Sequence, residues 1–293
     1  MITTRVVSNL LNEHPFGWII VGYFLAAAIG SGLMIFTMVV HLFRLSKFDR
    51  LARITAFLTP VFAGLMGLTL ILELAQPTRF WRVMFNFNPT SPISWGAWIL
   101  NLFGLLAVLY AYAEWKGITS WKRPLAVAGV PAAILLPMYT SFELLMTRSS
   151  PLWTSALLPV MYLLSAVLAG TAVVILISAL TRPNSTAEVS FTLGRVGSHL
   201  LVYGLALVIV QVLVLLSRSP QAVAIGKNLV AGAYSGSFWG LVVGGGTLVP
   251  IALLYLPATG KTRAGQIVAS LLILVGLFSQ RALEIFAGMD FPQ

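Results

Sequence analysis

The sequence predicts an all-α polytopic membrane protein, with eight transmembrane helices arranged as two four-helix bundles. The 293 residues are 58% hydrophobic and only 9% charged, a composition that soluble domains of this size do not have. Apolar runs of about 20 residues, the length that crosses a bilayer, recur eight times along the chain. The loops between these runs are short, so neighbouring helices are expected to be antiparallel.

Each predicted span is a mostly apolar run bounded by polar or helix-breaking residues. In chain order, the spans are 17–43, 54–75, 93–113, 125–145, 157–180, 199–216, 237–256 and 267–286. The second span ends just before Pro77, because the residue before a proline avoids helical geometry. The fourth contains Pro137, which loosens the helix near its outer end. Small residues at 30–32 and 240–246 let the first and seventh spans approach their neighbours closely.

A weak internal repeat supports the two-bundle arrangement. Tyr23 precedes FLAAAIGSG in the first span, and Tyr162 precedes LLSAVLAG in the fifth. Four spans separate the two motifs, so both helices cross the membrane in the same direction. The sequence therefore predicts an N-terminal bundle over 1–150 and a C-terminal bundle over 151–293.

The loop charges predict the orientation. An even number of spans places both termini and the 72–98 loop on one side of the membrane. Of the 18 Lys and Arg residues, 7 fall on that side and 11 on the other. The richer side is expected to be cytoplasmic, so the termini and the 72–98 loop should face the periplasm from a prokaryotic inner membrane. The formal charge of +10 is spread over short loops, so the expected partner is membrane lipid and not nucleic acid.

Residues that hold redox centres are scarce in this chain. It has no cysteine and therefore no ligands for an iron–sulfur cluster of its own. Its histidines, His14, His41 and His199, fall at or beyond the ends of predicted spans and cannot face each other across a bundle. A haem held by paired histidines is therefore not expected, and no metal site is predicted.

Two carboxylates are predicted inside the membrane near its outer face, Glu73 in the second span and Glu143 in the fourth. A charged group at the bilayer centre costs at least about 2.5 kcal/mol, so an embedded carboxylate is a functional hypothesis by default. Tyr139 lies one helical turn before Glu143 and shares its face. A tyrosine and a carboxylate in an apolar pocket suit a quinone, since the hydroxyl can hydrogen-bond a quinone oxygen and a carboxylate can relay protons.

The loop after Glu73 also has a purely structural interpretation, as an interfacial anchor. Arginine side chains extend to the headgroups, tryptophans form an aromatic belt, and an acid balances the arginines. Taken singly, Trp81 and Arg82 fit an anchor better than a ligand site. Glu73 fits the functional interpretation better, because the anchor does not need a carboxylate in hydrocarbon.

The stretch LELAQPTRFWRVMFNFNPTSPISWGAW at 72–98 resembles the signature of the NrfD/PsrC family, the integral membrane subunits of molybdenum-dependent respiratory complexes such as polysulfide reductase. The family pattern is Asp-Leu-Gly-Arg-Pro-x-Arg-Phe-Trp, followed by Asn-Pro-Thr-Ser-Pro-x-Ser-Trp-Gly. The second part is intact at 88–96. In the first part, at 73–81, the acid is kept as Glu73, while the Gly and the first Arg are replaced. The Tyr-Thr-Ser at 139–141 resembles the family's fourth-span Tyr-Thr-Gly, and the number of spans also matches.

This resemblance implies a function. The family's membrane subunit carries no redox metal and exchanges electrons between a membrane quinone, menaquinone or ubiquinone, and an iron–sulfur subunit of the four-cluster, ferredoxin-like type. A molybdopterin catalytic subunit sits beyond that partner. The resemblance implies that Tyr139 binds the quinone. Alignment of the first span places Tyr23 where the polysulfide reductase subunit has a quinone-contacting histidine.

The same resemblance suggests roles for the remaining candidates. Glu73 is expected to be the catalytic, proton-handling acid, Glu143 a second acid, and Arg79 an electrostatic clamp beside the quinone. The residues expected to cap the pocket or to dock the iron–sulfur partner are Arg82, Asn88, Pro89, Ser91 and Trp95.

Two other functions stay open. A secondary transporter also has repeated bundles, proline-broken helices and a buried acid. A membrane anchor without a quinone site is consistent with the lost Gly and Arg of the signature. Gln211, Arg281 and Glu284 are interpreted as polar residues that join helices, not as a second site.

Overall fold

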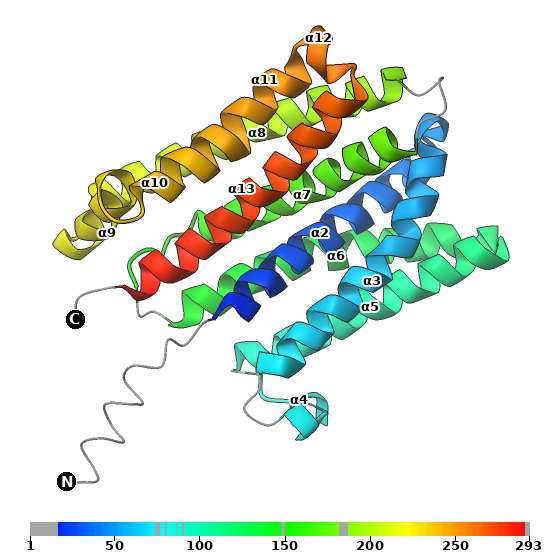
Figure 1. The fold of residues 1–293 in the computed structure, drawn as a ribbon. Helices are drawn as coiled ribbons and strands as arrows, with labels where there is room; N and C mark the ends of the chain where they lie inside the picture. The colour runs from blue at the N-terminus through cyan, green and yellow to red at the C-terminus, as the bar shows by residue number, and fades with distance from the viewer. Residues whose placement is uncertain are drawn as a thin grey trace.

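In the computed structural model, the described residues are 17–73, 77–79, 81–85, 87–89, 91–147, 150–181 and 187–290. All regular secondary structure within these ranges is helical, and eight of the helical stretches are long and apolar enough to cross a membrane. The prediction of an all-α polytopic protein with eight spans is therefore confirmed. Figure 1 shows the long helices side by side, with the start of α2, the end of α13 and the short helix α4 at the same end of the molecule.

The long helices match the predicted spans in order. They are α2 (Trp18–Leu42), α3 (Asp49–Glu73), α5 (Pro92–Lys116), α6 (Thr119–Thr147), α7 (Leu158–Leu180), α8 (Ala187–Leu216), the π-helix η3 (Phe238–Leu248) continued by α11 (Val249–Tyr255), and α13 (Arg263–Met289). The short helices are η1 (Ser46–Phe48), η2 (Pro77–Arg79), α4 (Arg82–Phe85), α9 (Pro220–Ala231), α10 (Ser235–Ser237) and α12 (Pro257–Gly260).

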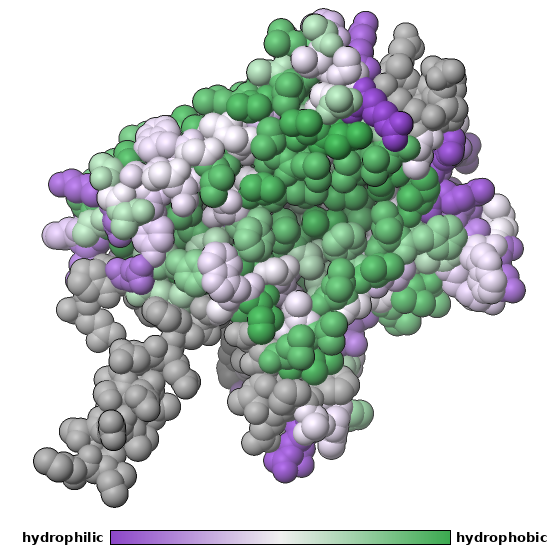
Figure 2. Space-filling view, in the orientation of Figure 1, coloured by the Kyte–Doolittle hydropathy of each residue, from purple (hydrophilic) through white to green (hydrophobic). Residues whose placement is uncertain are grey.

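Apolar side chains cover the middle of the molecule, and hydrophilic residues gather toward its ends (Figure 2). This banding is what a bilayer requires, because hydrocarbon contacts the centre and headgroups contact the ends. Large apolar residues on the surface, such as Leu102, Leu105 and Val108 of α5, are about half exposed. Such residues would face lipid in the membrane.

The helix α8 begins at Ala187, well before the predicted span start at 199. The extra turns carry Arg195, whose guanidinium lies 4.9 Å from the centre of the Phe191 ring. A charged residue interrupts an apolar run in the sequence, but it does not end a helix that extends into the headgroup region. The segment between α8 and α10 also holds the helix α9, where Ser219 caps the N-terminus by accepting from the Ala222 amide and Pro220 occupies the first turn.

Helix α2 is the most central helix of the fold. It packs against α3, α6 and α7, and it also contacts α13. Its closest crossing is with α7, where a Cβ atom on Gly32 would lie 2.0 Å from the Ala166 carbonyl oxygen and 2.7 Å from the Gly170 Cα. The predicted close approach of the small residues at 30–32 is thus confirmed at Gly32. The division into bundles at 1–150 and 151–293 stays a prediction.

The seventh span departs from a regular α-helix. Residues Phe238–Leu248 form a π-helix, and Thr247 donates from its hydroxyl to the Val242 carbonyl five residues earlier, at 2.8 Å. Long π-helices are rare, and short ones cluster at functional sites. Here the glycines free the wider backbone to contact α13: a Cβ atom on Gly246 would lie 2.5 Å from the Gly276 Cα.

Candidate functional site

Tyr139 and Glu143 form the centre of the candidate site. They lie one turn apart in the last part of α6, and the Tyr139 hydroxyl donates a hydrogen bond to Glu143 Oε1 at 2.6 Å. Tyr139 is only 7% exposed. Within the same helix, Thr140 donates to the Pro137 carbonyl at 2.8 Å. The sequence-based prediction that Tyr139 and Glu143 share a face is confirmed by this contact.

Gly96 makes room for the Tyr139 ring. A Cβ atom on Gly96 would lie 1.8 Å from Tyr139 Cζ and 1.9 Å from its hydroxyl oxygen. Real Cβ atoms do not come this close to other heavy atoms, so only glycine fits at this point of α5. Gly96 is the last residue of the intact 88–96 motif. The structure thus gives this motif glycine a physical role: it lets the tyrosine pack flat against the backbone of a neighbouring helix.

The rest of the 88–96 motif folds the loop onto the start of α5. The Ser94 hydroxyl accepts from the Asn88 amide at 3.2 Å, and the Trp95 indole donates to the Pro89 carbonyl at 2.9 Å. The Trp95 ring also meets the Phe87 ring edge-on at 5.1 Å. Helix α5 starts at Pro92, in the first turn, where the missing proline amide costs nothing. The Ser94 and Trp95 side chains therefore hold the loop against the first turns of α5, next to Gly96.

Tyr23 of α2 lies close to this pair. Its side chain is fully buried, and among the described residues its hydroxyl has no hydrogen-bond partner. Its hydroxyl is within electrostatic range of both Glu143 and Tyr139. A buried hydroxyl without a partner is unusual, since the large majority of buried polar groups are satisfied. The Tyr23 hydroxyl is therefore a donor that no described residue uses.

The other predicted acid and the two arginines come from the end of α3 and from the short helices that follow it. Helix α3 ends at Glu73, but the Glu73 side chain lies outside the described part of the structure. Arg79 ends the helical turn η2 and is exposed. Arg82 begins α4, is also exposed, and stacks 5.6 Å from the centre of the Trp81 ring. The Arg82–Trp81 contact is what an interfacial anchor predicts.

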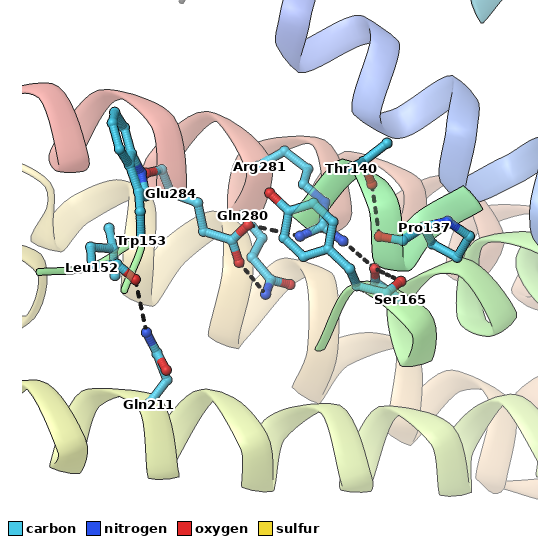
Figure 3. A network of polar contacts seen from close by, with 10 residues as sticks. Pro137, Thr140, Leu152, Trp153, Ser165, Gln211, Gln280, Arg281 and Glu284 are labelled. Atoms are coloured by element: carbon cyan, nitrogen blue, oxygen red, sulfur yellow. Dashed lines mark hydrogen bonds and ion pairs between the residues drawn. The ribbon is translucent and has the colours of Figure 1, made fainter. Parts of the chain in front are cut away.

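A second polar cluster lies between α13 and α7, and Figure 3 shows it. Arg281 Nη1 lies 2.7 Å from Glu284 Oε2, and both side chains are less than one-tenth exposed. The same guanidinium donates to the Ser165 hydroxyl of α7 and lies 3.3 Å from the centre of the Tyr162 ring. Gln280 donates to the other Glu284 oxygen at 3.0 Å. Both members of the ion pair therefore have a further hydrogen-bond partner, as a buried charge pair requires.

This cluster extends to the segment before α7. The Trp153 indole donates to the Glu284 carbonyl at 2.7 Å, and Gln211 of α8 accepts from the Ser155 hydroxyl at 2.7 Å. These contacts join α13, α8 and the 150–157 segment, which supports the interpretation of Gln211, Arg281 and Glu284 as residues that join helices. The contacts of Ser165 and Trp153 in this cluster could not be predicted, because their partners are more than 100 positions away in the sequence. Tyr162 stands out in the sequence through the motif that it shares with Tyr23.

The two repeated tyrosines both contact the ring of Phe24, where α2 packs against α7. The Phe24 ring lies 5.5 Å from the Tyr23 ring and meets the Tyr162 ring edge-on at 5.7 Å. The Tyr23 hydroxyl is within electrostatic range of the Tyr139–Glu143 pair, and the Arg281 guanidinium stacks on the Tyr162 ring. The aromatic contact therefore places the two polar clusters next to each other, near the same end of the helices.

Metal-ligating groups are not gathered anywhere in the described ranges: no three His, Cys, Asp or Glu side chains there lie close enough to hold an ion. The site contains hydroxyl and carboxylate groups between apolar helices. Such a set can bind and protonate an uncharged, oxygen-bearing organic molecule.

Comparison with known proteins places this sequence in a family. The model of the family described as "Polysulphide reductase, NrfD" matches residues 6–293. The sequence is 26% identical to component C of the polysulfide reductase of Wolinella succinogenes, over 96% of both proteins. It is 24% identical to the Hdr-like menaquinol oxidoreductase integral membrane subunit of Archaeoglobus fulgidus, covering 98% of this protein and 74% of the relative.

A third relative, protein NrfD of Escherichia coli, is 28% identical over 81% of this protein and 82% of its own length. The family match spans the eight helices, the motif loop and the Tyr139–Glu143 segment together. This protein therefore belongs to the NrfD (polysulphide reductase) family of integral membrane subunits.

Proposed function

We propose that this protein is the quinone-reactive membrane subunit of a respiratory molybdopterin and iron–sulfur oxidoreductase. In this role it exchanges electrons between the membrane quinone pool and an iron–sulfur partner. The observation that carries the proposal is the hydrogen bond from Tyr139 to Glu143 against Gly96, beside the buried Tyr23 hydroxyl. The name of the Archaeoglobus relative, a menaquinol oxidoreductase subunit, supports a quinone as the ligand and favours menaquinone.

The residues present fit a quinone head group. A quinone is a flat, uncharged ring with two carbonyl oxygens, which takes up two electrons and two protons when reduced. The Tyr23 hydroxyl lacks a partner among the described residues and can donate to one such oxygen. The Tyr139 hydroxyl can turn from Glu143 toward the ring or hold Glu143 in place. The surrounding helices supply the apolar walls that such a ligand needs.

The proposed role of the carboxylates is to hold and move protons. Glu143 accepts the Tyr139 hydroxyl proton in a hydrogen bond, and a proton on Glu143 can pass through that hydroxyl toward a ligand oxygen. Glu73, at the end of α3 and next to the motif loop, remains the candidate for the acid that exchanges protons with the aqueous side. Arg79 remains a candidate electrostatic clamp at this edge.

The proposed docking surface for the iron–sulfur partner is the loop between α3 and α5. Its residues Arg82, Asn88, Pro89 and Trp95 are exposed, and Ser91 is half-buried. Loops held by a rigid scaffold often carry binding residues. We propose that a four-cluster ferredoxin-like subunit binds here, that a molybdopterin subunit lies beyond it, and that this face is periplasmic at the inner membrane. Two further relatives are named as subunits of a selenate reductase and of a tetrathionate reductase, which supports such partners.

The first experiment is purification of the native complex, followed by mass spectrometry of the copurifying subunits and extraction of its lipids for quinone. The expected result is an iron–sulfur subunit, a molybdopterin subunit and bound quinone. Partner subunits without quinone, together with unchanged electron transfer after quinone extraction, would leave a membrane anchor. A lone protein that moves a solute in vesicles would establish the transporter instead.

A further inference from the structure

A basic hollow lies at the opposite end of α6 from the candidate site. It consists of two adjoining depressions between the end of α2, the start of α3, the end of α5 and the start of α6, which share His41 and Asp49. The depression lined by Arg44 and Arg123 has a volume of about 1150 Å³, and the one lined by Arg50 and Arg53 about 860 Å³, each including its open mouth. The charged residues that line the hollow are Arg44, Asp49, Arg50, Arg53, Glu114, Lys122 and Arg123.

The charges in this hollow do not cancel. Glu114 is held by Arg53 at 3.1 Å and by Lys122 at 2.7 Å, so that group already carries one excess positive charge. Within the described part of the sequence, Arg44, Arg50 and Arg123 have no ion-pair partner. Asp49 is the remaining acid of the lining. A ligand that neutralises the hollow must therefore be anionic, and guanidinium groups fit the oxygens of a phosphate.

The backbone at Arg44 gives an independent reason to expect a ligand. Arg44 has φ 53°, the one positive φ at a residue other than glycine among the described residues. It follows the last turn of α2, where the Leu45 amide donates to the Val40 carbonyl at 2.9 Å and closes the helix. Helices that end in this way usually have glycine at this position, because a Cβ atom is strained there. An arginine that lines a hollow at a strained position suggests that its side chain has a use.

The hollow lies at headgroup depth. Phe43, beside Arg44, is 71% exposed, and Trp121, beside Lys122, is 45% exposed. Trp115 and Trp121 flank Tyr112, with ring centres 6.2 Å and 6.4 Å away, so aromatic rings bridge α5 and α6 next to the hollow. Exposed aromatic rings are enriched where hydrocarbon gives way to headgroups. A ligand here would have its phosphate in the hollow and apolar tails along the lipid-facing helices.

We propose that the basic hollow binds the phosphate of an anionic membrane lipid, with Arg44 and Arg123 as its principal ligands. Basic pockets between transmembrane helices are known to bind such headgroups, most often at the cytoplasmic leaflet. That leaflet is also the side that the charge count assigns to this end of the molecule. The inference is independent of the proposed quinone chemistry, which takes place at the other end of the helices.

The test is lipid binding to the purified full-length protein, or to its native complex, in detergent. Native mass spectrometry measures the retained lipid, and thermal unfolding measures the stabilisation that added phosphatidylglycerol or phosphatidylcholine gives. Arg44→Gly and Arg123→Gln each remove one cation, and Arg218→Gln, in the turn after α8, is the matched control at the opposite end. Removal of a surface cation is expected to weaken anionic lipid binding about fivefold, and removal of both about 25-fold.

The expected result is a preference of the wild-type protein for phosphatidylglycerol over phosphatidylcholine, lost in the double variant and kept in Arg218→Gln. Arg44→Gly should also raise the unfolding temperature without lipid, because glycine relieves the strained φ, and yet respond less to lipid. Equal binding of both lipids, or an unchanged affinity in the double variant, would overturn the proposal. The proposal would also be overturned if millimolar inorganic phosphate alone stabilised the protein as much as phosphatidylglycerol does. The ligand would then be a soluble anion. Quinol oxidation is not a readout in this test, so its outcome is separate from that of the proposed function.

Discussion

The ring of Tyr139 on α6 lies directly against the backbone of Gly96 on α5, with no room for a Cβ atom between them. This contact connects the motif loop to the Tyr139–Glu143 hydrogen bond, because Gly96 ends the same motif whose Ser94 and Trp95 side chains fold the loop. Substitutions in the loop, at Gly96 or at Tyr139 should therefore all disturb the Tyr139–Glu143 hydrogen bond.

Replacing Gly96 with alanine should displace the Tyr139 ring and break its hydrogen bond to Glu143. The expected cost is about 1–3 kcal/mol in the free energy of unfolding, as for other overpacked sites, and quinol turnover should fall strongly. Gly104→Ala is the matched control on the same helix, since a Cβ atom there would meet Ala63 at an ordinary 3.8 Å. Turnover by Gly96→Ala as high as that of Gly104→Ala would show that the close contact has no role in the reaction.

Replacing Tyr139 with phenylalanine should remove the hydroxyl while keeping the ring against Gly96. Loss of a hydrogen bond to a carboxylate or a ligand oxygen is expected to lower kcat/KM for quinol by about 10- to 100-fold. Tyr203→Phe, at an exposed position on α8, is the control. Steady-state oxidation of a quinol analogue by the purified complex measures the effect, and a wild-type rate would remove Tyr139 from the site.

Glutamine in place of either Glu143 or Glu73 should distinguish the two candidate acids. Glu143→Gln keeps an oxygen that accepts from Tyr139 but cannot carry a proton, so turnover should fall while the complex still assembles. Glu73→Gln should abolish turnover if Glu73 is the acid that exchanges protons with the aqueous side. Glu114→Gln, in the ion pairs at the other end of α5, is the control. Unchanged turnover in a variant would exclude that carboxylate from proton transfer.

Trp95→Phe should weaken the folded loop, because the indole donor to the Pro89 carbonyl is lost while the aromatic contact with Phe87 can remain. A lost hydrogen bond of this kind costs about 1 kcal/mol, so the proposed iron–sulfur partner should dissociate several-fold faster. Trp98→Phe, three residues along the same helix and 49% exposed, is the control. Copurification of the partner after washing, with equal yields for both variants, would argue against this docking surface.

The Arg281–Glu284 pair should behave as a structural ion pair. Arg281→Met leaves Glu284 buried without its cation and should destabilise the protein by about 3–5 kcal/mol. Replacing both with Met and Leu should recover much of this loss, since a buried pair is often replaceable by apolar residues. Thermal unfolding in detergent measures both. Equal instability of the single and double variants would mean that the charges themselves, and not only their pairing, are required.

Several features of this protein follow from local sequence alone. An apolar run of spanning length can hide its backbone groups from lipid only as a helix, so the spans were predictable one by one. The positions of Tyr139 and Glu143 on one face follow from helix periodicity. The motif at 88–96 resembles a family signature, and the comparison confirms that family.

Helix boundaries were harder to predict from the sequence where a helix contains charged residues. The predicted sixth span starts at 199, after Arg195, but α8 begins earlier, at Ala187, because a helix can extend into the headgroup region with its charges solvated or stacked on a ring. The π-helix at Phe238–Leu248 was also not predicted, and its close approach to α13 at Gly246 joins segments about 30 positions apart in the sequence.

The sequence by itself determined the membrane class, the eight spans, the pairing of Tyr139 with Glu143 and the family. These depend on hydrophobic length, helix periodicity and a contiguous motif. Only the tertiary structure decided that Gly96 supports Tyr139, that Tyr23 approaches that pair with a hydroxyl unpartnered among the described residues, and that Arg281 reaches Ser165 across 116 positions. Such contacts join distant segments, and they depend on how neighbouring helices cross, which hydrophobic periodicity does not specify.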